Sequence, residues 1–166
     1  MELRITQLHT RPPEVIAELT EVWESSVRAT HLFLSEQEIE RLRGCVPQAL
    51  SAVDQLAAVR DRDGRCVGFM GTEEGRLEML FLAPQARGRG VGRRLLQYGI
   101  DRFKVRTLTV NEQNPGAVGF YQHMGFRVVR RTPLDEQGAP YPLLYMERRG
   151  PDAAPRFEQD NLYAEE

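Results

Sequence analysis

Three alternating glycines place the strongest constraint on this chain. The segment Arg87–Gly92 lies between the apolar run Leu77–Leu82 and the amphipathic run Leu95–Tyr98, where a strand is expected to end and a helix to begin. Glycine permits positive φ and lets backbone N–H groups approach a ligand closely. The start of a helix adds unpaired N–H donors and the positive end of the helix dipole. The segment therefore predicts a site for an anion, and the alternative is a surface turn without a ligand.

The glycine spacing excludes two common phosphate-binding loops. A dinucleotide fingerprint needs a third glycine where this chain has Arg93, and it also needs an acidic ribose partner. A P-loop continues from its last glycine with Lys and then Ser or Thr, whereas two arginines follow Gly92. A Gln/Arg-x-x-Gly-x-Gly pattern remains, in the registers Arg87–Gly92 and Gln85–Gly90. We take the first register, because it is expected to place Gly92 directly before the helix.

Composition limits the class of protein. The 166 residues allow one domain with a substantial core. A net charge of -2, with 41% hydrophobic and 28% charged residues, argues against disorder and against binding of nucleic acid through bulk charge. Two cysteines and three unpaired histidines predict no disulfide framework and no metal site. The sequence has no membrane-spanning run and no signal peptide, so we expect a cytoplasmic protein without a membrane partner.

Hydrophobic periodicity predicts alternating strands and helices in the first half of the chain. We expect a strand over 3–8, a helix after Pro12-Pro13, a hairpin over 55–70 and a strand over 77–82. Ser35 and Glu38 have the spacing of a capping box and predict the start of a second helix. Pro47 is expected to kink or interrupt that helix.

The second half continues this order after the glycine segment. We expect a helix to about residue 103, a strand over 105–110, a helix capped by Asn114 and ended by Gly125, and a final antiparallel pair over 126–129 and 142–146. A strand, a helix and a strand in succession indicate parallel pairing. Residues 150–166 are polar and rich in proline and alanine, which predicts a loosely held tail.

Two motifs and this element order resemble the GNAT family of N-acetyltransferases. The glycine segment is similar to the acyl-CoA pyrophosphate loop of the family. Asn114-x-x-Ala117-x-x-Phe120-Tyr121-x-x-x-Gly125-Phe126 is similar to its second signature. The pieces 29–31, 110–114 and 140–144 further resemble a small bacterial subgroup. The resemblance implies an α/β (α+β) acyl-CoA N-acyltransferase fold over residues 1–149, with a mixed sheet of about seven strands and about four helices, splayed between strands 4 and 5.

The resemblance implies acetyl-CoA as the cofactor. The backbone of one strand would bind the acyl-pantetheine, the glycine loop would bind the pyrophosphate through N–H groups, and arginine side chains would add charge-assisted hydrogen bonds. The residues that this assigns to the cofactor are Leu80, Phe81, Leu82, Arg87, Gly88, Arg89, Gly90, Val91, Gly92, Arg93, Asn114, Ala117 and Tyr121.

Two side chains are candidates for proton transfer. Tyr121 shares a helix face with Asn114, and its phenol is a suitable general acid for a departing thiolate. Glu78 alternates with Leu80 and Leu82 on one strand face, where it is a candidate base for the incoming amine. The alternatives are a core aromatic for Tyr121 and a solvated strand start for Glu78.

The segment between the first two helices borders the acceptor pocket in this family. Its candidate residue is His31, either as a contact to the acceptor or as the base, with an ordinary hydrogen-bonded linker residue as the alternative. Neighbouring candidates for the pocket are Trp23, Arg28 and Phe33, and Tyr141 is a candidate from the connection between the last two strands.

These residues favour an acetyl-CoA-dependent N-acetyltransferase that acts by direct attack of a primary amine in a ternary complex. The acceptor is expected to be a small-molecule amine or a peptide amine. The alternative is a non-catalytic acyl-CoA-binding module that regulates or binds a partner. We expect no nucleic-acid partner, and the chain is predicted to be a monomer or a homodimer.

Overall fold

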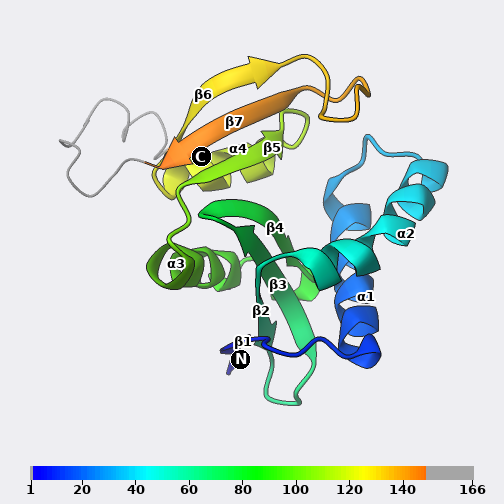
Figure 1. The fold of residues 1–166 in the computed structure, drawn as a ribbon, viewed down its shortest axis with the longest axis vertical. Coiled ribbons are helices and arrows are strands. Elements are labelled where there is room, and N and C mark those ends of the chain that lie inside the picture. Colours follow the sequence, from blue (N-terminus) through cyan, green and yellow to red (C-terminus); the bar gives the residue numbers. More distant parts are fainter. Residues whose placement is uncertain (1, 149–166) are drawn as a thin grey trace. The chain divides into compact units, whose positions relative to one another are not determined.

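The computed structural model describes residues 2–148, which contain seven strands and four α-helices (Figure 1). These elements fall into two compact units, Met1–Val105 and Arg106–Glu166. The predicted tail over 150–166 lies outside the described residues, so its looseness stays a prediction.

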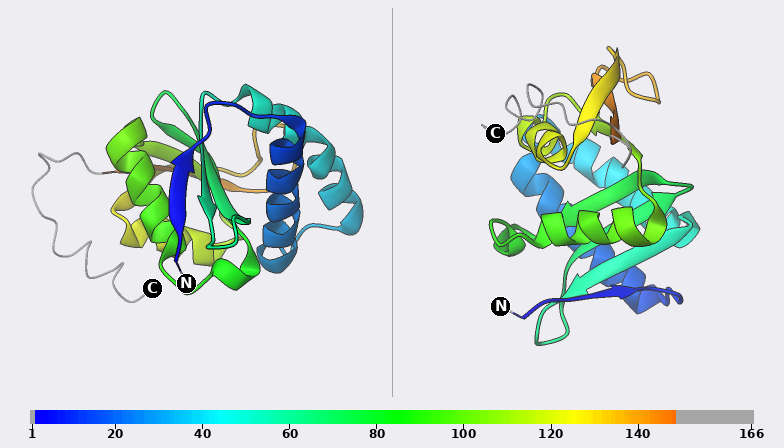
Figure 2. Two further views of the ribbon diagram at one scale, coloured as in Figure 1. Left: turned by 90° about the horizontal axis from the view of Figure 1, so that it is seen from below. Right: turned by 90° about the vertical axis from the view of Figure 1, so that its left-hand side faces the viewer.

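The first unit is built on four antiparallel strands in the order β1-β2-β3-β4. Their bounds are β1 (Arg4–Gln7), β2 (Gln55–Arg60), β3 (Cys66–Glu73) and β4 (Arg76–Leu82). The inner strands β2 and β3 are almost entirely buried, as expected of strands covered on both faces. Figure 2 shows that α1 (Pro13–Thr30) covers one face of this unit and α3 (Val91–Phe103) covers the other.

Helices α1 and α2 (Glu36–Ala52) pack together against the sheet. Apolar residues at helical spacing on α1 place Leu19 and Trp23 in a core with Leu50 and Phe69. The predicted capping box is confirmed, because the side chain of Ser35 accepts from the N–H of Glu38 while the Glu38 carboxylate accepts from the N–H of Ser35.

The prediction that Pro47 interrupts the second helix is wrong, because α2 continues through it to Ala52. Proline removes only one hydrogen bond, the one that its N–H would make to the carbonyl four residues back. Burial of Ile39, Val46 and Leu50 on the core face holds the helix together on both sides of the proline.

Helix α3 begins at Val91, two residues earlier than the chosen glycine register requires. Gly90, with φ +75°, is the residue before the helix, and Gly92 lies in its first turn without a positive φ. The argument that Gly92 directly precedes the helix is therefore wrong. By that criterion the register Gln85–Gly90 fits the structure, because the left-handed backbone that ends the turn falls at Gly90.

The second unit has three antiparallel strands in the order β5-β7-β6 and one helix. Their bounds are β5 (Thr107–Asn111), α4 (Pro115–His123), β6 (Phe126–Thr132) and β7 (Leu143–Arg148). Asn114 caps α4 as predicted, since its Oδ1 accepts from the N–H of Ala117 at 3.2 Å. Gly125 follows the helix with φ +96°, which allows the chain to turn into β6.

Candidate active site

The glycine loop presents a row of backbone donors at the start of α3. Arg94 is the first residue whose N–H bonds back along the helix, to the Gly90 carbonyl at 3.1 Å. Among residues 2–148, the N–H groups of Gly90, Val91, Gly92 and Arg93 therefore have no acceptor within the helix. These four donors and the positive helix end form a site suited to a phosphate.

Two arginines of the loop make hydrogen bonds within the protein. Arg87 Nη2 donates to the Oγ of Ser26 on α1 at 3.2 Å, and partial burial lowers the pKa of its guanidinium. Arg89 Nε donates to the carbonyl of Gln85 at 3.3 Å. Arg93 is exposed on the first turn of α3. Arg87 is thus engaged with α1 and is also exposed, as Arg89 and Arg93 are, so a charged ligand can reach all three side chains.

Glu78 lies at an irregularity of β4. In the pairing of β3 with β4, Gly71 lies opposite Met79 and Thr72 lies opposite Leu77. Glu78 is therefore an extra residue of β4 with no partner position on β3, which is a β-bulge. The bulge interrupts the period of two at Glu78, on which the expected alternation with Leu80 and Leu82 depends. Glu78 is exposed and lies 3.5 Å from the guanidinium of Arg76.

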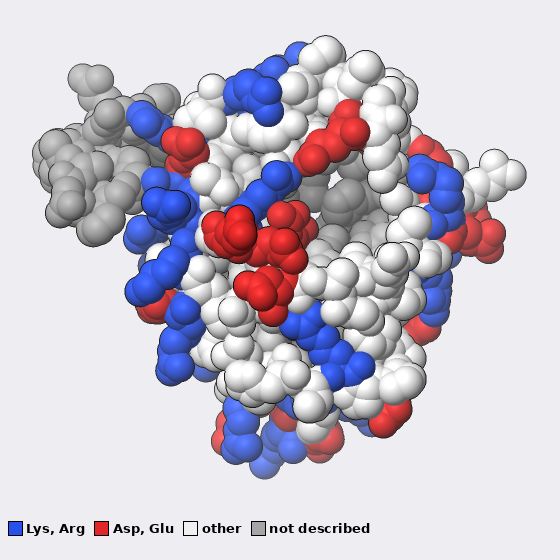
Figure 3. Space-filling view, viewed as in Figure 1, with Lys and Arg blue, Asp and Glu red and all other residues white. Residues whose placement is uncertain are grey.

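A surface pocket of about 300 Å³ opens beside this bulge. The pocket is lined by four apolar residues and two glutamates; they are Ala49, Ala52, Val53, Met79, Glu73 and Glu78. Glu73 also accepts from the N–H of Asp54 at 3.0 Å, which adds a third acidic side chain nearby. Figure 3 shows acidic side chains gathered at the centre of the face on which β4 is seen.

His31 ends α1 and is half-buried. Its Nδ1 lies 2.9 Å from the Oγ1 of Thr30, and its ring lies against Phe33 with 5.4 Å between centroids. Burial lowers the pKa of the imidazole, and the positive charge of Arg87 lowers it further. The structure therefore brings His31 and Phe33 together and connects them with the glycine loop.

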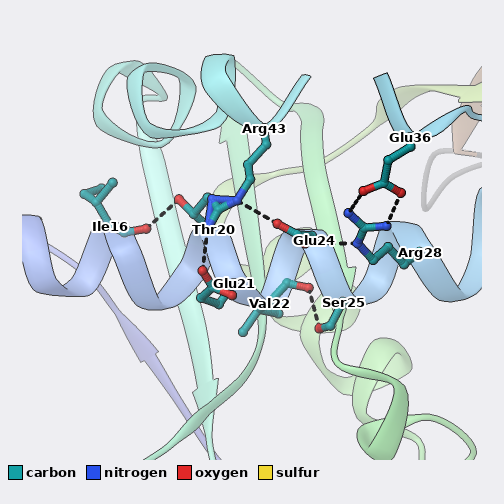
Figure 4. Close-up of polar contacts among 9 residues, drawn as sticks. All are labelled: Ile16, Thr20, Glu21, Val22, Glu24, Ser25, Arg28, Glu36 and Arg43. Carbon is teal, nitrogen blue, oxygen red and sulfur yellow. Dashed lines mark hydrogen bonds and ion pairs between the residues drawn. The ribbon is translucent and has the colours of Figure 1, made fainter. Parts of the chain in front are cut away.

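Trp23 and Arg28 have structural partners instead of an open pocket. Trp23 is buried, and its ring meets Phe81 edge to face at 6.5 Å between centroids. Arg28 pairs with Glu24 at 3.0 Å and with Glu36 at 2.6 Å, which joins the two helices (Figure 4). These contacts favour packing for Trp23 and helix linkage for Arg28 over a contact with the acceptor.

Tyr121 is buried in the second unit, with its ring edge to face against Phe120 and Phe126. Burial raises the pKa of its phenol above the ordinary value, so the group stays protonated at neutral pH. Its hydroxyl has no hydrogen-bond partner in the described part of the chain, which leaves the proton available to a ligand. Tyr141 is half-buried, and its N–H donates to the carbonyl of Ala139 at 2.8 Å.

Comparison with known proteins decides the family. A family model for the acetyltransferase (GNAT) domain matches residues 30–143. The peptidyl-lysine N-acetyltransferase YjaB of Escherichia coli (strain K12) is 42% identical over 127 residues, which cover 76% of this chain and 86% of YjaB. The chain belongs to the GNAT acetyltransferase family. It has the predicted GNAT fold and is an acetyl-CoA-dependent N-acetyltransferase, so the alternative of a non-catalytic module is set aside.

Two further similarities extend this result. The peptidyl-lysine N-acetyltransferase YiaC of Escherichia coli (strain K12) is 34% identical over 125 residues, which cover 74% of this chain and 84% of YiaC. The solution structure of apo-form YjaB from Escherichia coli aligns with a TM-score of 0.80 and 37% identity, over 90% of this chain and 99% of YjaB. The small bacterial subgroup predicted from the sequence is thus the one to which YjaB belongs.

Two residues that the structure places beside candidate site residues were not predicted from the sequence. Ser26 holds Arg87, and its buried position follows from its spacing with Trp23 and Thr30 along the core face of α1. Glu73 lines the pocket with Glu78, but the bulge that brings them together has no signal in the sequence.

The described residues also bear on the expected absences. Over residues 2–148 no group of three or more metal-ligating side chains lies close enough to hold an ion. No helix in that range is long and apolar enough to cross a membrane.

Proposed function

We propose that this GNAT enzyme transfers the acetyl group of acetyl-CoA to the Nε amine of lysine in a peptide or protein. The observation that carries the proposal is the similarity to two enzymes named peptidyl-lysine N-acetyltransferases, at 42% and 34% identity over about three quarters of the chain. The acidic pocket beside β4 supports a cationic acceptor, because its charge is complementary to a lysine-containing peptide.

In the proposed site, the pyrophosphate binds to the free N–H groups at the start of α3, from Gly90 to Arg93. Arg89 and Arg93 add positive charge from the surface. The backbone of Leu80, Phe81 and Leu82 binds the acyl-pantetheine and donates an N–H to the thioester carbonyl. The hydrogen bond from the N–H of Ala117 to the side chain of Asn114 caps the start of α4, the helix that carries Tyr121.

The proposed reaction is a direct attack. The lysine ammonium first gives one proton to solvent, and the amine nitrogen then forms a bond to the carbonyl carbon. The carbon–sulfur bond breaks to release the thiolate of CoA, and the nitrogen gives a second proton to solvent. The phenol of Tyr121 gives its proton to the sulfur as negative charge develops there, and it regains a proton from solvent. Glu73 and Glu78 attract the incoming ammonium group. A relay through Cys66 is disfavoured, because burial raises the pKa of that thiol to about 11 and keeps it protonated.

The test is turnover of acetyl-CoA with an N-terminally blocked peptide that contains one lysine. We expect turnover with this peptide and none when arginine replaces the lysine. Turnover restricted to polyamines or free amino acids would contradict a peptide acceptor while leaving the N-acetyltransferase activity intact.

Substitutions in the acidic pocket test the source of the preference for a cation. Glu73→Gln and Glu78→Gln are each expected to raise the KM for the peptide up to about fivefold. This corresponds to the interaction energy of an exposed ion pair, which is at most about 1 kcal/mol. The KM for acetyl-CoA is expected to stay unchanged. Glu74→Gln is the matched control, because Glu74 lies in the adjoining turn but does not line the pocket.

A further inference from the structure

Arg11 caps the carboxyl end of α2 from a segment distant in the sequence. It lies between β1 and α1, and its Nη1 donates to the carbonyls of Leu50 at 2.9 Å and Ser51 at 3.2 Å. Both carbonyls belong to the last turn of α2. Carbonyls in the last turn of a helix have too few N–H groups of that helix to pair with, and a cation there is stabilised by the helix dipole. Arg11 therefore fixes the point at which α2 ends.

Arg11 also holds the peptide group that follows the helix. Its Nη1 donates to the carbonyl of Val53, and its Nη2 donates to the carbonyl of Asp54 at 3.1 Å. The N–H of Asp54 belongs to the same planar peptide group as the Val53 carbonyl, so a contact that fixes one orients the other. This N–H donates to Oε1 of Glu73 at 3.0 Å. A guanidinium on the carbonyl also polarises the N–H, which strengthens its hydrogen bond to the carboxylate.

Glu73 lines the acidic pocket beside β4 and is held through one of its two oxygens. Among residues 2–148, its Oε2 has no hydrogen-bond or ion-pair partner. The other carboxylate of the pocket, that of Glu78, lies 3.5 Å from the guanidinium of Arg76. A carboxylate that is already fixed loses little side-chain freedom when it binds a cation. Glu73 is therefore the carboxylate of this pocket that is fixed in place and still open to an ammonium group.

We propose that Arg11 is a positioning residue for the cationic acceptor, because it orients the Asp54 peptide group that holds Glu73 in the acidic pocket. This inference rests on the proposed function. All the contacts that carry it lie within the first unit, Met1–Val105. The positive charge of Arg11 by itself repels a cation in the pocket, whereas its hydrogen bonds favour cation binding through Glu73. The sign of the effect of removing Arg11 therefore distinguishes the two influences.

The first test is steady-state kinetics of Arg11→Gln with the lysine peptide. We expect the KM for the peptide to rise up to about fivefold, the limit set by Glu73, while kcat and the KM for acetyl-CoA stay unchanged. Arg60→Gln is the matched control, because Arg60 also donates to a backbone carbonyl, that of Gly64, but does not line the pocket. Arg11→Lys keeps the charge at the end of α2 and replaces Arg11→Gln if that variant does not fold. An unchanged or lowered peptide KM in the variant that folds overturns the proposal.

A double-mutant cycle tests whether Arg11 acts through Glu73. Residues that act through one contact show non-additive effects, whereas independent residues show additive ones. In the Glu73→Gln background, Arg11→Gln is expected to raise the peptide KM no further. In the Glu78→Gln background, the same substitution is expected to have its full effect. Additive effects of Arg11→Gln and Glu73→Gln overturn the proposal, because a purely structural role of Arg11 does not depend on Glu73.

The third test needs no acetyl transfer and so separates this inference from the proposed function. Glu73→Ala removes the acceptor of the Asp54 N–H and is expected to move that amide proton upfield in ¹H–¹⁵N spectra of the whole protein. In the Arg11→Gln background the same substitution is expected to move it much less, because the hydrogen bond to Glu73 is already lost. An equal move in both backgrounds overturns the positioning role even if the enzyme acetylates lysine. Unequal moves in an enzyme that does not acetylate the lysine peptide contradict the proposed acceptor and support the positioning of Glu73 by Arg11.

Discussion

Arg28 and Glu36 form a two-point contact between the end of α1 and the start of α2, with Nη1–Oε2 at 2.7 Å and Nη2–Oε1 at 2.6 Å. Arg43 of α2 in turn pairs with Glu21 and Glu24 of α1 (Figure 4). Four charged side chains besides Arg28 thus connect the two helices on either side of the linker that holds His31. The position of this linker depends on charge as well as on core packing.

Arg28→Ala is expected to lower the melting temperature slightly at pH 7 and by less at pH 3. Hydrogen bonds from Arg28 lower the pKa of Glu36 below its ordinary value of 4.5. The stabilisation by this pair is therefore complete above pH 4.5 and is lost as the pH falls through the lowered pKa. Thermal melts at both values measure the effect. Arg41→Ala, an exposed arginine of α2 without an ion pair among the described residues, is the control.

Gly90→Ala is expected to destabilise the protein and weaken acetyl-CoA binding, because Gly90 has φ +75° at the start of α3. A left-handed residue other than glycine costs about 1–2 kcal/mol. Relaxation of that strain would also turn the N–H groups of the loop away from the phosphate. Gly92→Ala lies in the first helical turn and is expected to leave stability almost unchanged. Urea unfolding and titration calorimetry with CoA measure both properties; equal losses in the two variants would contradict the assignment of the turn to Gly90.

Gly99→Ala is expected to destabilise the protein by about 1–3 kcal/mol, the usual effect of overpacking. A methyl group at Gly99 would lie 2.6 Å from the sulfur of Met70, which is fully buried where α3 crosses β3. Gly44 of α2 has no atom within 4 Å of the same position, so Gly44→Ala is expected to stabilise the helix by up to about 1 kcal/mol. Urea denaturation midpoints give both values, and a neutral Gly99→Ala would mean that Met70 moves aside freely.

Tyr121→Phe is expected to lower kcat by about 10²–10⁴-fold, the usual contribution of a general acid. The KM for acetyl-CoA is expected to change little, since the aromatic ring and its contacts with Phe120 and Phe126 remain. Stability is expected to be retained, because the hydroxyl has no hydrogen-bond partner in the described chain. Steady-state kinetics beside Tyr98→Phe, a tyrosine of α3, measures the effect. An undiminished kcat would remove Tyr121 from the acid role.

Short sequence patterns are sufficient to predict most of the helices and strands. The capping box at Ser35 and the Asn114-Pro115 helix start depend on contacts within four residues, so the sequence predicts both. The position of the glycine loop between a strand and a helix is also predicted from the sequence, whereas the residue at which the helix begins is not. Pro47 is different, because the burial that carries α2 past it comes from residues distant in the chain.

The site was less predictable for the same reason. The bulge at Glu78 and the contact of Arg87 with Ser26 both join segments far apart in sequence. The sequence predicts that Arg87 binds the phosphate because it lies in the loop, and the hydrogen bond of its side chain to Ser26 on α1 had no signal in the sequence.

The central claim is that acetyl-CoA acetylates a lysine side chain. Its most direct test is tandem mass spectrometry of an unblocked peptide with one lysine, after incubation with the enzyme and isotope-labelled acetyl-CoA. The account predicts one labelled acetyl group on the lysine Nε and none in a reaction without enzyme. Label on the N-terminal amine alone, or release of CoA with no acetylated peptide, would contradict it.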